Sequence, residues 1–199
     1  MGRPRQFTDE EILDATQACI LANGPSVSTT MIAERLQMSQ AALFKRFGTK
    51  EKLIIAALSR PMLRNPIAEI MGVGPSKEPI RDQMIAMGTA ILMVMRRVVP
   101  CMSMLHAAGI DPTQLHGENS PPIQGRKYLT QWFQAVIDQG RVQQVFDPHV
   151  MAVGFLGMLH ARPFRETILG DTALECTDLE YVTQLVGLLW TGIGLEEGA

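Results

Sequence analysis

The stretch from residue 28 to residue 47, STTMIAERLQMSQAALFKRF, carries the side chains whose types and spacing could bind a nucleic acid. It holds two short helical patterns separated by a tight turn, each preceded by a serine that can cap a helix. The outer face of the second pattern is left to Gln40, Ala41, Phe44 and Lys45, and the free N–H groups behind Ser39 can bind a phosphate. This arrangement predicts a helix-turn-helix, although short amphipathic helix pairs also occur without that role.

Motifs for catalysis or metal binding are not found in the sequence. There is no G-x-S-x-G, no P-loop, no H-E-x-x-H and no dinucleotide-binding glycine pattern. The four histidines have no ligand spacing, and the three widely spaced cysteines would leave one unpaired in any disulfide scheme, as expected in a reducing compartment. We therefore expect no enzyme activity, no catalytic residue, no metal and no cofactor.

Composition and charge indicate a globular chain with a local basic region. Of the 199 residues, 46% are hydrophobic and 19% are charged, which excludes disorder as the main state. No secretory signal is visible and no apolar run reaches the roughly 20 residues that span a bilayer, so we expect a cytoplasmic protein with no membrane contact. The net charge is −2, yet basic residues are concentrated at Arg3 and Arg5 and between Lys45 and Lys52.

The spacing of apolar residues predicts helices and no strands. Thr8 with Glu11, Ser28, Ser39 and Thr49 can each begin a helix within the first 60 residues. Later helices are expected over 80–99, apolar nearly all round, buried on all sides and ended by Pro100, and over 124–139, 150–169 and 179–195. The predicted fold is all-α, with a three-helix helix-turn-helix domain over 1–58 and a larger helical domain over 59–199.

Residues 7–58 resemble the DNA-binding domain of TetR-family transcriptional regulators. The residues that carry the resemblance are TDEEILDATQACILANG and STTMIAERLQMSQAALFKRFGTKEKLIIAAL. By this resemblance Thr29 and Thr30 approach the DNA backbone, and Lys50 contacts a phosphate at the start of the next helix. Gln40 and Lys45 would contact base edges in the major groove, where Gln can read adenine and Lys can read guanine.

Phe44 occupies a position that is usually Tyr in the family, so it keeps the packing against the backbone and lacks the phosphate-binding hydroxyl. Gln37 stands where the turn usually carries Gly, which predicts a positive φ strained by roughly 1 kcal/mol. Ala41 also replaces a frequent Gly, which limits close approach to DNA. Arg3 and Arg5 could enter the minor groove, or could form a solvated terminus.

The larger domain, by the same resemblance, should bind a small effector. Six of the 13 methionines lie between Met84 and Met104, and methionine adapts readily to varied ligands. We expect a hydrophobic effector, with the alternative that the same residues only fill a core. The candidate lining residues are Met84, Met87, Ile91, Met95, Met102, His106, Trp132, Phe133, Phe155 and Met158.

The last two helices are too apolar to face water on a monomer, which predicts a homodimer with a two-fold four-helix interface. The candidate interface residues are Phe155, Leu156, Leu185, Leu188, Leu189 and Trp190. The resemblance implies a transcriptional repressor that a small hydrophobic effector releases from a pseudo-palindromic double-stranded DNA operator. The alternative is a helical ligand-binding or adaptor protein whose DNA binding is weak or lost.

Overall fold

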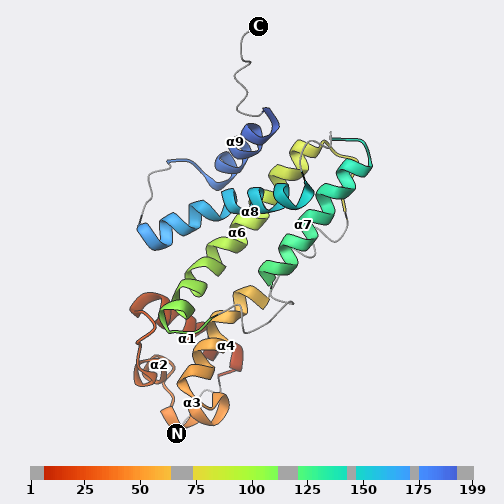
Figure 1. Cartoon of the computed structure of the whole chain (residues 1–199). Helices are drawn as coiled ribbons and strands as arrows, with labels where there is room; N and C mark the ends of the chain where they lie inside the picture. Colours follow the sequence, from red (N-terminus) through yellow and green to blue (C-terminus); the bar gives the residue numbers. More distant parts are fainter. Residues whose placement is uncertain (1–6, 64–73, 112–120, 143–146, 171–174, 192–199) are drawn as a thin grey trace. The chain divides into compact units, whose positions relative to one another are not determined.

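The structure, a computed structural model, describes residues 7–63, 74–111, 121–142, 147–170 and 175–191. These ranges contain helices and no strand, which confirms the predicted all-α class (Figure 1). The chain divides into two compact units, Met1–Arg64 with Pro100–Gly117 and Asn65–Val99 with Glu118–Ala199. The assignment of separate functions to 1–58 and 59–199 stays a prediction.

The first unit contains four helices, α1 (Asp9–Asn23), α2 (Thr29–Arg35), α3 (Gln40–Phe47) and α4 (Lys50–Leu63). Each begins at the predicted cap. Thr8 and Glu11 form a reciprocal capping box, and the hydroxyls of Ser28, Ser39 and Thr49 each accept a backbone N–H three residues ahead at 3.1–3.2 Å. The caps satisfy N–H groups that a helix start leaves unpaired, which is why local sequence fixes these boundaries.

The helices of the first unit enclose an apolar core. Ile12, Ile20, Ile32, Leu43 and Leu58, which come from all four helices, are completely buried. Between α2 and α3 the chain turns through Gln37, whose φ is 50°, the one positive φ at a non-glycine residue in the described ranges. This confirms the positive φ predicted for that turn.

The long helix α6 (Ile80–Ala107) does not end at Pro100, so the predicted break there was wrong. Proline removes one helical N–H and crowds the preceding turn, which bends a helix more often than it ends one when the flanking residues are held. Cys101 and Leu105, on the far side of Pro100, are fully buried and hold the helix there. Helix α4 likewise continues through Pro61.

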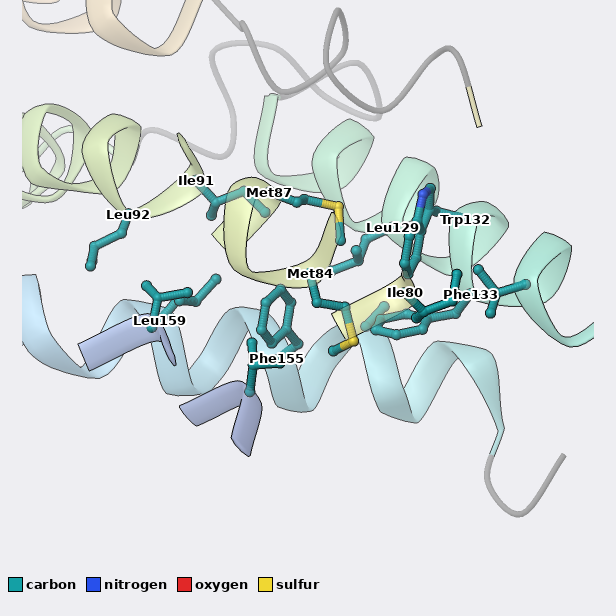
Figure 2. Packing of buried hydrophobic residues seen from close by; sticks show 14 residues of the cluster. Ile80, Met84, Met87, Ile91, Leu92, Leu129, Trp132, Phe133, Phe155 and Leu159 are labelled. Carbon is teal, nitrogen blue, oxygen red and sulfur yellow. The ribbon is translucent and has the colours of Figure 1, made fainter. Parts of the chain in front are cut away.

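The second unit packs α6 against α7 (Pro121–Asp138), α8 (Pro148–Phe164) and α9 (Asp178–Thr191), with a π-helical turn, η2 (Arg165–Leu169), following α8. Figure 2 shows the apolar cluster at the centre, with Met84 of α6, Phe133 of α7 and Phe155 of α8 lying together. Gly88 lets α6 approach closely, because a Cβ there would lie 2.8 Å from Val182 and 2.9 Å from Phe155.

One face of α6 is exposed, so the expectation that residues 80–99 are buried on all sides was wrong. Met93 is 56% exposed, and Arg81, Asp82, Arg96 and Arg97 also face outward. In the described residues α6 is the one helix whose length and apolar composition would allow it to cross a membrane. Its buried side chains pack against α7 and α8, as in the core helix of a globular domain.

Ion pairs join four elements of the second unit, α6, α8, η2 and α9. Arg96 of α6 donates to the carboxylate of Asp178 at 2.6 and 2.7 Å and also binds Glu166 of η2. Arg162 of α8, which is buried, binds Glu166 at 3.1 Å and the backbone carbonyl of Thr177 at 3.3 Å. Hydrogen bonds from Arg96 hold the pKa of Asp178 below its usual range, so the Asp178 carboxylate is ionised at neutral pH.

Candidate functional site

The outer face of α3 is open to solvent. Ala41 and Lys45 are exposed, and Phe44 presents 37% of its surface, whereas Leu43 on the opposite side is completely buried. Burial of Leu43 fixes the rotation of the helix, so the three outward residues form one continuous strip. Ser39 caps the helix through the N–H of Ala42 at 3.2 Å, as predicted.

Gln40, the first residue of α3, is tied to the start of α2. Its side-chain Nε2 donates to the hydroxyl of Thr29 at 3.2 Å and to the hydroxyl of Thr30. The structure therefore brings these three predicted DNA-contacting residues together at the junction of the two helices. The contacts join residues 10 and 11 positions apart in the sequence, so no local pattern predicts them.

Lys50 lies at the start of α4, where its Nζ donates to the carbonyl of Ser26 at 3.4 Å. An ammonium group has three donors, so two remain for other acceptors. The predicted Arg3 and Arg5 lie outside the described residues.

Arg46 holds α3 against the beginning of α1, a role that sequence reasoning missed. Its guanidinium donates to the carbonyl of Phe7 at 2.6 Å and pairs with Asp9 at 2.6 Å. The only sequence signal was an additional cation on α3, and its partners lie more than 35 residues away. Arg46 therefore positions the start of α1, and its guanidinium is engaged within the protein.

The second unit contains a cavity of about 280 Å³. It lies among the first turns of α6, the end of α7, the start of α8 and the end of α9. Arg141 is its charged lining residue, and its guanidinium is bound to the backbone carbonyls of Ser76, Lys77 and Glu78. The other lining residues are apolar: Ile80, Met84, Phe133, Val136, Ile137, Val142, Met151, Leu189 and Trp190.

No group of three or more His, Cys, Asp or Glu side chains in the described ranges is placed to hold a metal ion. The three cysteines are free thiols.

Comparison with known proteins supplies the family. The model for bacterial regulatory proteins of the tetR family matches residues 12–57, the segment that forms α1 to α4. No curated protein sequence matches the chain. Residues 12–57 belong to the tetR family. Members of this family are bacterial regulatory proteins.

Several solved structures share the fold over nearly the whole chain. A regulator from Mesorhizobium loti is 18% identical, with a TM-score of 0.71 over 92% of this chain and 95% of that one. FadR from Bacillus subtilis, in complex with stearoyl-CoA, is 14% identical with a TM-score of 0.70 over 94% and 100%. AibR, in complex with isovaleryl coenzyme A and operator DNA, is 20% identical with a TM-score of 0.62 over 90% and 96%.

The predicted effector-lining residues are divided between several parts of the structure. Met84 and Phe133 line the cavity. Four others belong to the surrounding apolar core: Met87, Ile91, Trp132 and Phe155. Met95 and Met158 are partly buried, and Met102 and His106 lie beyond Pro100 in the first compact unit, where His106 is exposed.

The predicted dimer residues lie on α8 and α9, and half of them are exposed. Leu188, Leu189 and Trp190 are between 44% and 49% exposed, whereas Leu156 and Leu185 are half-buried. Phe155 is buried in the core with 1% exposure. Other exposed apolar residues that sequence reasoning did not name share these helices: Val150, Val153, Phe164 and Leu179.

Proposed function

We propose that this tetR-family regulator is a homodimeric, cytoplasmic repressor that places α3 of each protomer in successive major grooves of a pseudo-palindromic operator. The observation that carries the proposal is the exposed strip of Ala41, Phe44 and Lys45 on a capped helix, within the segment that matches the family. An eight-residue α-helix is about 12 Å long, which suits a major groove about 12 Å wide.

The DNA contacts proposed for each protomer combine base reading and backbone positioning. Gln40 and Lys45 face the base edges, with Phe44 and Ala41 against the sugar-phosphate backbone. The capped N-terminus at Ser39, the hydroxyls of Thr29 and Thr30, and Lys50 bind phosphates. Arg3 and Arg5 are proposed to reach the minor groove.

The effector is proposed to bind in the cavity beside Met84 and Phe133. A volume of about 280 Å³ is near the lower end of ligand sites, which favours a small molecule. The lining is apolar apart from Arg141, so the ligand has a hydrophobic body and an acceptor or anionic group turned toward the guanidinium. FadR and AibR are solved with acyl-coenzyme A molecules, which supports a small acyl compound as the first class to screen.

Repression is relieved, in this proposal, when the effector favours a dimer whose two α3 helices are wrongly spaced for the operator. Such coupling needs a different effector affinity in the two conformers, typically worth 1–3 kcal/mol. The dimer is held by α8 and α9, whose exposed apolar residues would otherwise face water.

Selection from a random duplex library with the full chain tests the DNA-binding part. An enriched inverted repeat is expected, and acyl compounds of two to ten carbons, free and as coenzyme A thioesters, are then titrated against that complex. Release of DNA by a compound that binds the wild type and not Met84→Trp, which fills the cavity, supports the effector site. No enrichment at low or moderate salt would instead indicate a helical binding protein without DNA function.

A further inference from the structure

The hydrogen bonds of Gln40 determine which side of its amide faces outward. Nε2 donates to the hydroxyl oxygens of Thr29 and Thr30. A primary amide has two N–H donors and one carbonyl acceptor. With both donors engaged by α2, the carbonyl Oε1 is the group that Gln40 has left to offer a ligand.

A DNA backbone contact would strengthen this orientation. Each threonine hydroxyl has one proton, and phosphate oxygens are acceptors, so a threonine that binds phosphate must donate its proton outward. Its oxygen can then only accept from Gln40. The amide cannot turn over without placing its carbonyl oxygen against an oxygen that has no proton to give.

An unrestrained glutamine reads adenine with both ends of its amide, accepting from N6 and donating to N7. Gln40 lacks the free donor that this pairing requires. A carbonyl alone accepts from an exocyclic amino group, which in the major groove means N4 of cytosine or N6 of adenine. Adenine would place its N7, an acceptor, beside the carbonyl oxygen of Gln40, which is also an acceptor. Cytosine presents only its N4 amino donor there.

We propose that Thr29 and Thr30 are specificity-determining residues, which hold the Gln40 amide with its carbonyl outward so that it reads cytosine N4 rather than adenine N6 and N7. The inference rests on the proposed function, since it takes α3 to be the helix in the major groove. It revises the adenine preference expected from the residue type alone.

The test compares selections from one random duplex library with the wild type, Thr30→Val, the double variant Thr29→Val with Thr30→Val, and Gln40→Glu. Valine keeps the shape of threonine and removes the hydroxyl. The wild type is expected to favour cytosine at one position of each half-site by about fivefold, the effect of one hydrogen bond. The double variant should bind more weakly and shift that position to adenine, because the amide is released.

Gln40→Glu should keep cytosine at the same position, since a carboxylate offers acceptors only. Thr130→Val is the matched control on α7, where the Thr130 hydroxyl donates to the carbonyl of Arg126. It should leave the affinity and every base preference unchanged. NMR gives a readout that does not depend on binding: the Gln40 side-chain amide protons should exchange slowly in the wild type and faster in Thr30→Val.

Three outcomes would overturn the proposal: a wild type that selects adenine at this position, a double variant that keeps every base preference, or amide protons that exchange alike with and without the hydroxyl. Failure of the wild type to enrich any site would instead refute the proposed function itself, and the inference with it.

Discussion

The phosphate contact proposed for Lys50 can be tested separately from base reading. Two of its three ammonium donors remain after the contact with Ser26. Lys50→Ala should weaken binding to all operator sequences about equally. It should also reduce the slope of log affinity against log salt by about one for each protomer bound, because one fewer counterion is released. Fluorescence anisotropy between about 50 and about 200 mM salt measures that slope.

Lys127→Ala supplies the control, since Lys127 is an exposed lysine on α7. It should leave both affinity and salt slope unchanged. If Lys50→Ala lowered the melting temperature and left the slope intact, Lys50 would be a structural tether to Ser26 and not a phosphate contact.

Because of Cys101, the free energy of unfolding should fall as the pH becomes alkaline. The side chain is completely buried, and burial raises the pKa of its thiol to about 11, although Gln17 offsets part of this by donating to Sγ at 3.2 Å. The folded state therefore holds a proton that the unfolded state releases near pH 9. Stability is full below pH 9 and falls as pH rises from 9 to 11, by up to about 2 kcal/mol.

Thermal melts of the wild type and Cys101→Ala at pH 8 and pH 10.5 check this dependence. The variant should be less stable than the wild type at pH 8, because it loses buried volume. Between pH 8 and pH 10.5 its melting temperature should fall by less than that of the wild type. Cys176→Ala, at a partly exposed thiol, should follow the wild-type pH dependence. Parallel pH profiles for wild type and Cys101→Ala would contradict the assignment.

At the scale of the helix, Gly88 sets how closely α6 approaches α8 and α9. Gly88→Ala should lower the free energy of unfolding by about 1–3 kcal/mol, because its Cβ would press on Val182 and Phe155 at less than 3 Å. Gly125→Ala on α7 is the matched control. No heavy atom lies within 4 Å of its added Cβ, so it should stabilise the helix by about 0.5–1 kcal/mol. Urea unfolding measures both values.

Adding Val182→Ala to Gly88→Ala tests the stated cause, since it removes the nearer obstructing carbon. The double variant should recover part of the loss, which appears as a favourable coupling energy in a double-mutant cycle. Strictly additive effects would show that close packing against α9 is not the reason for the glycine.

The elements that sequence could predict are those governed by near neighbours. Caps at Thr8, Ser28 and Ser39 depend on contacts three residues ahead, and all three were predicted. The strained turn at Gln37 was also predicted, since the resemblance places a glycine there. Pro100 was misjudged because burial of Cys101 and Leu105, a tertiary effect, outweighs the local tendency of proline to end a helix.

The parts of the candidate sites that escaped prediction depend on distant partners. The residues of α3 were identified from their pattern, but the bonds of Gln40 to α2 and of Arg46 to Phe7 were not. Of the six methionines between Met84 and Met104, only Met84 and Met87 are buried, and only Met84 lines the cavity. Which apolar residues pack and which leave space depends on the other helices, and one helix's sequence does not contain that information.

For the whole molecule, the exposed apolar side chains of α8 and α9 form the interface of the proposed dimer. Large apolar side chains on a helix pair are tolerated singly on a protein surface, but a continuous patch favours association. In a two-fold dimer the same patch meets itself, so every substitution acts twice. The exposed apolar residues of these two helices include Val150, Val153, Leu179, Leu188, Leu189 and Trp190.

Leu188→Glu should therefore convert the dimer into a folded monomer. Leu188 is 44% exposed in the single chain, so a carboxylate there is solvated in the monomer and costs its fold little. In the dimer two carboxylates would be buried without cationic partners, a cost of several kcal/mol. Light scattering at micromolar concentration should give half the wild-type mass, with unchanged far-UV circular dichroism, and the inverted repeat should be bound far more weakly because two half-sites are no longer linked.

Met93→Glu is the matched control, since it also replaces an exposed apolar side chain, 56% accessible on α6, with a carboxylate. It should remain dimeric and bind the operator as the wild type does, because Met93 lies outside the proposed interface. A Leu188→Glu protein that stays dimeric would place the two-fold contact on another surface. A monomeric wild type would remove the basis for half-site spacing, and each α3 would then have to read its site alone.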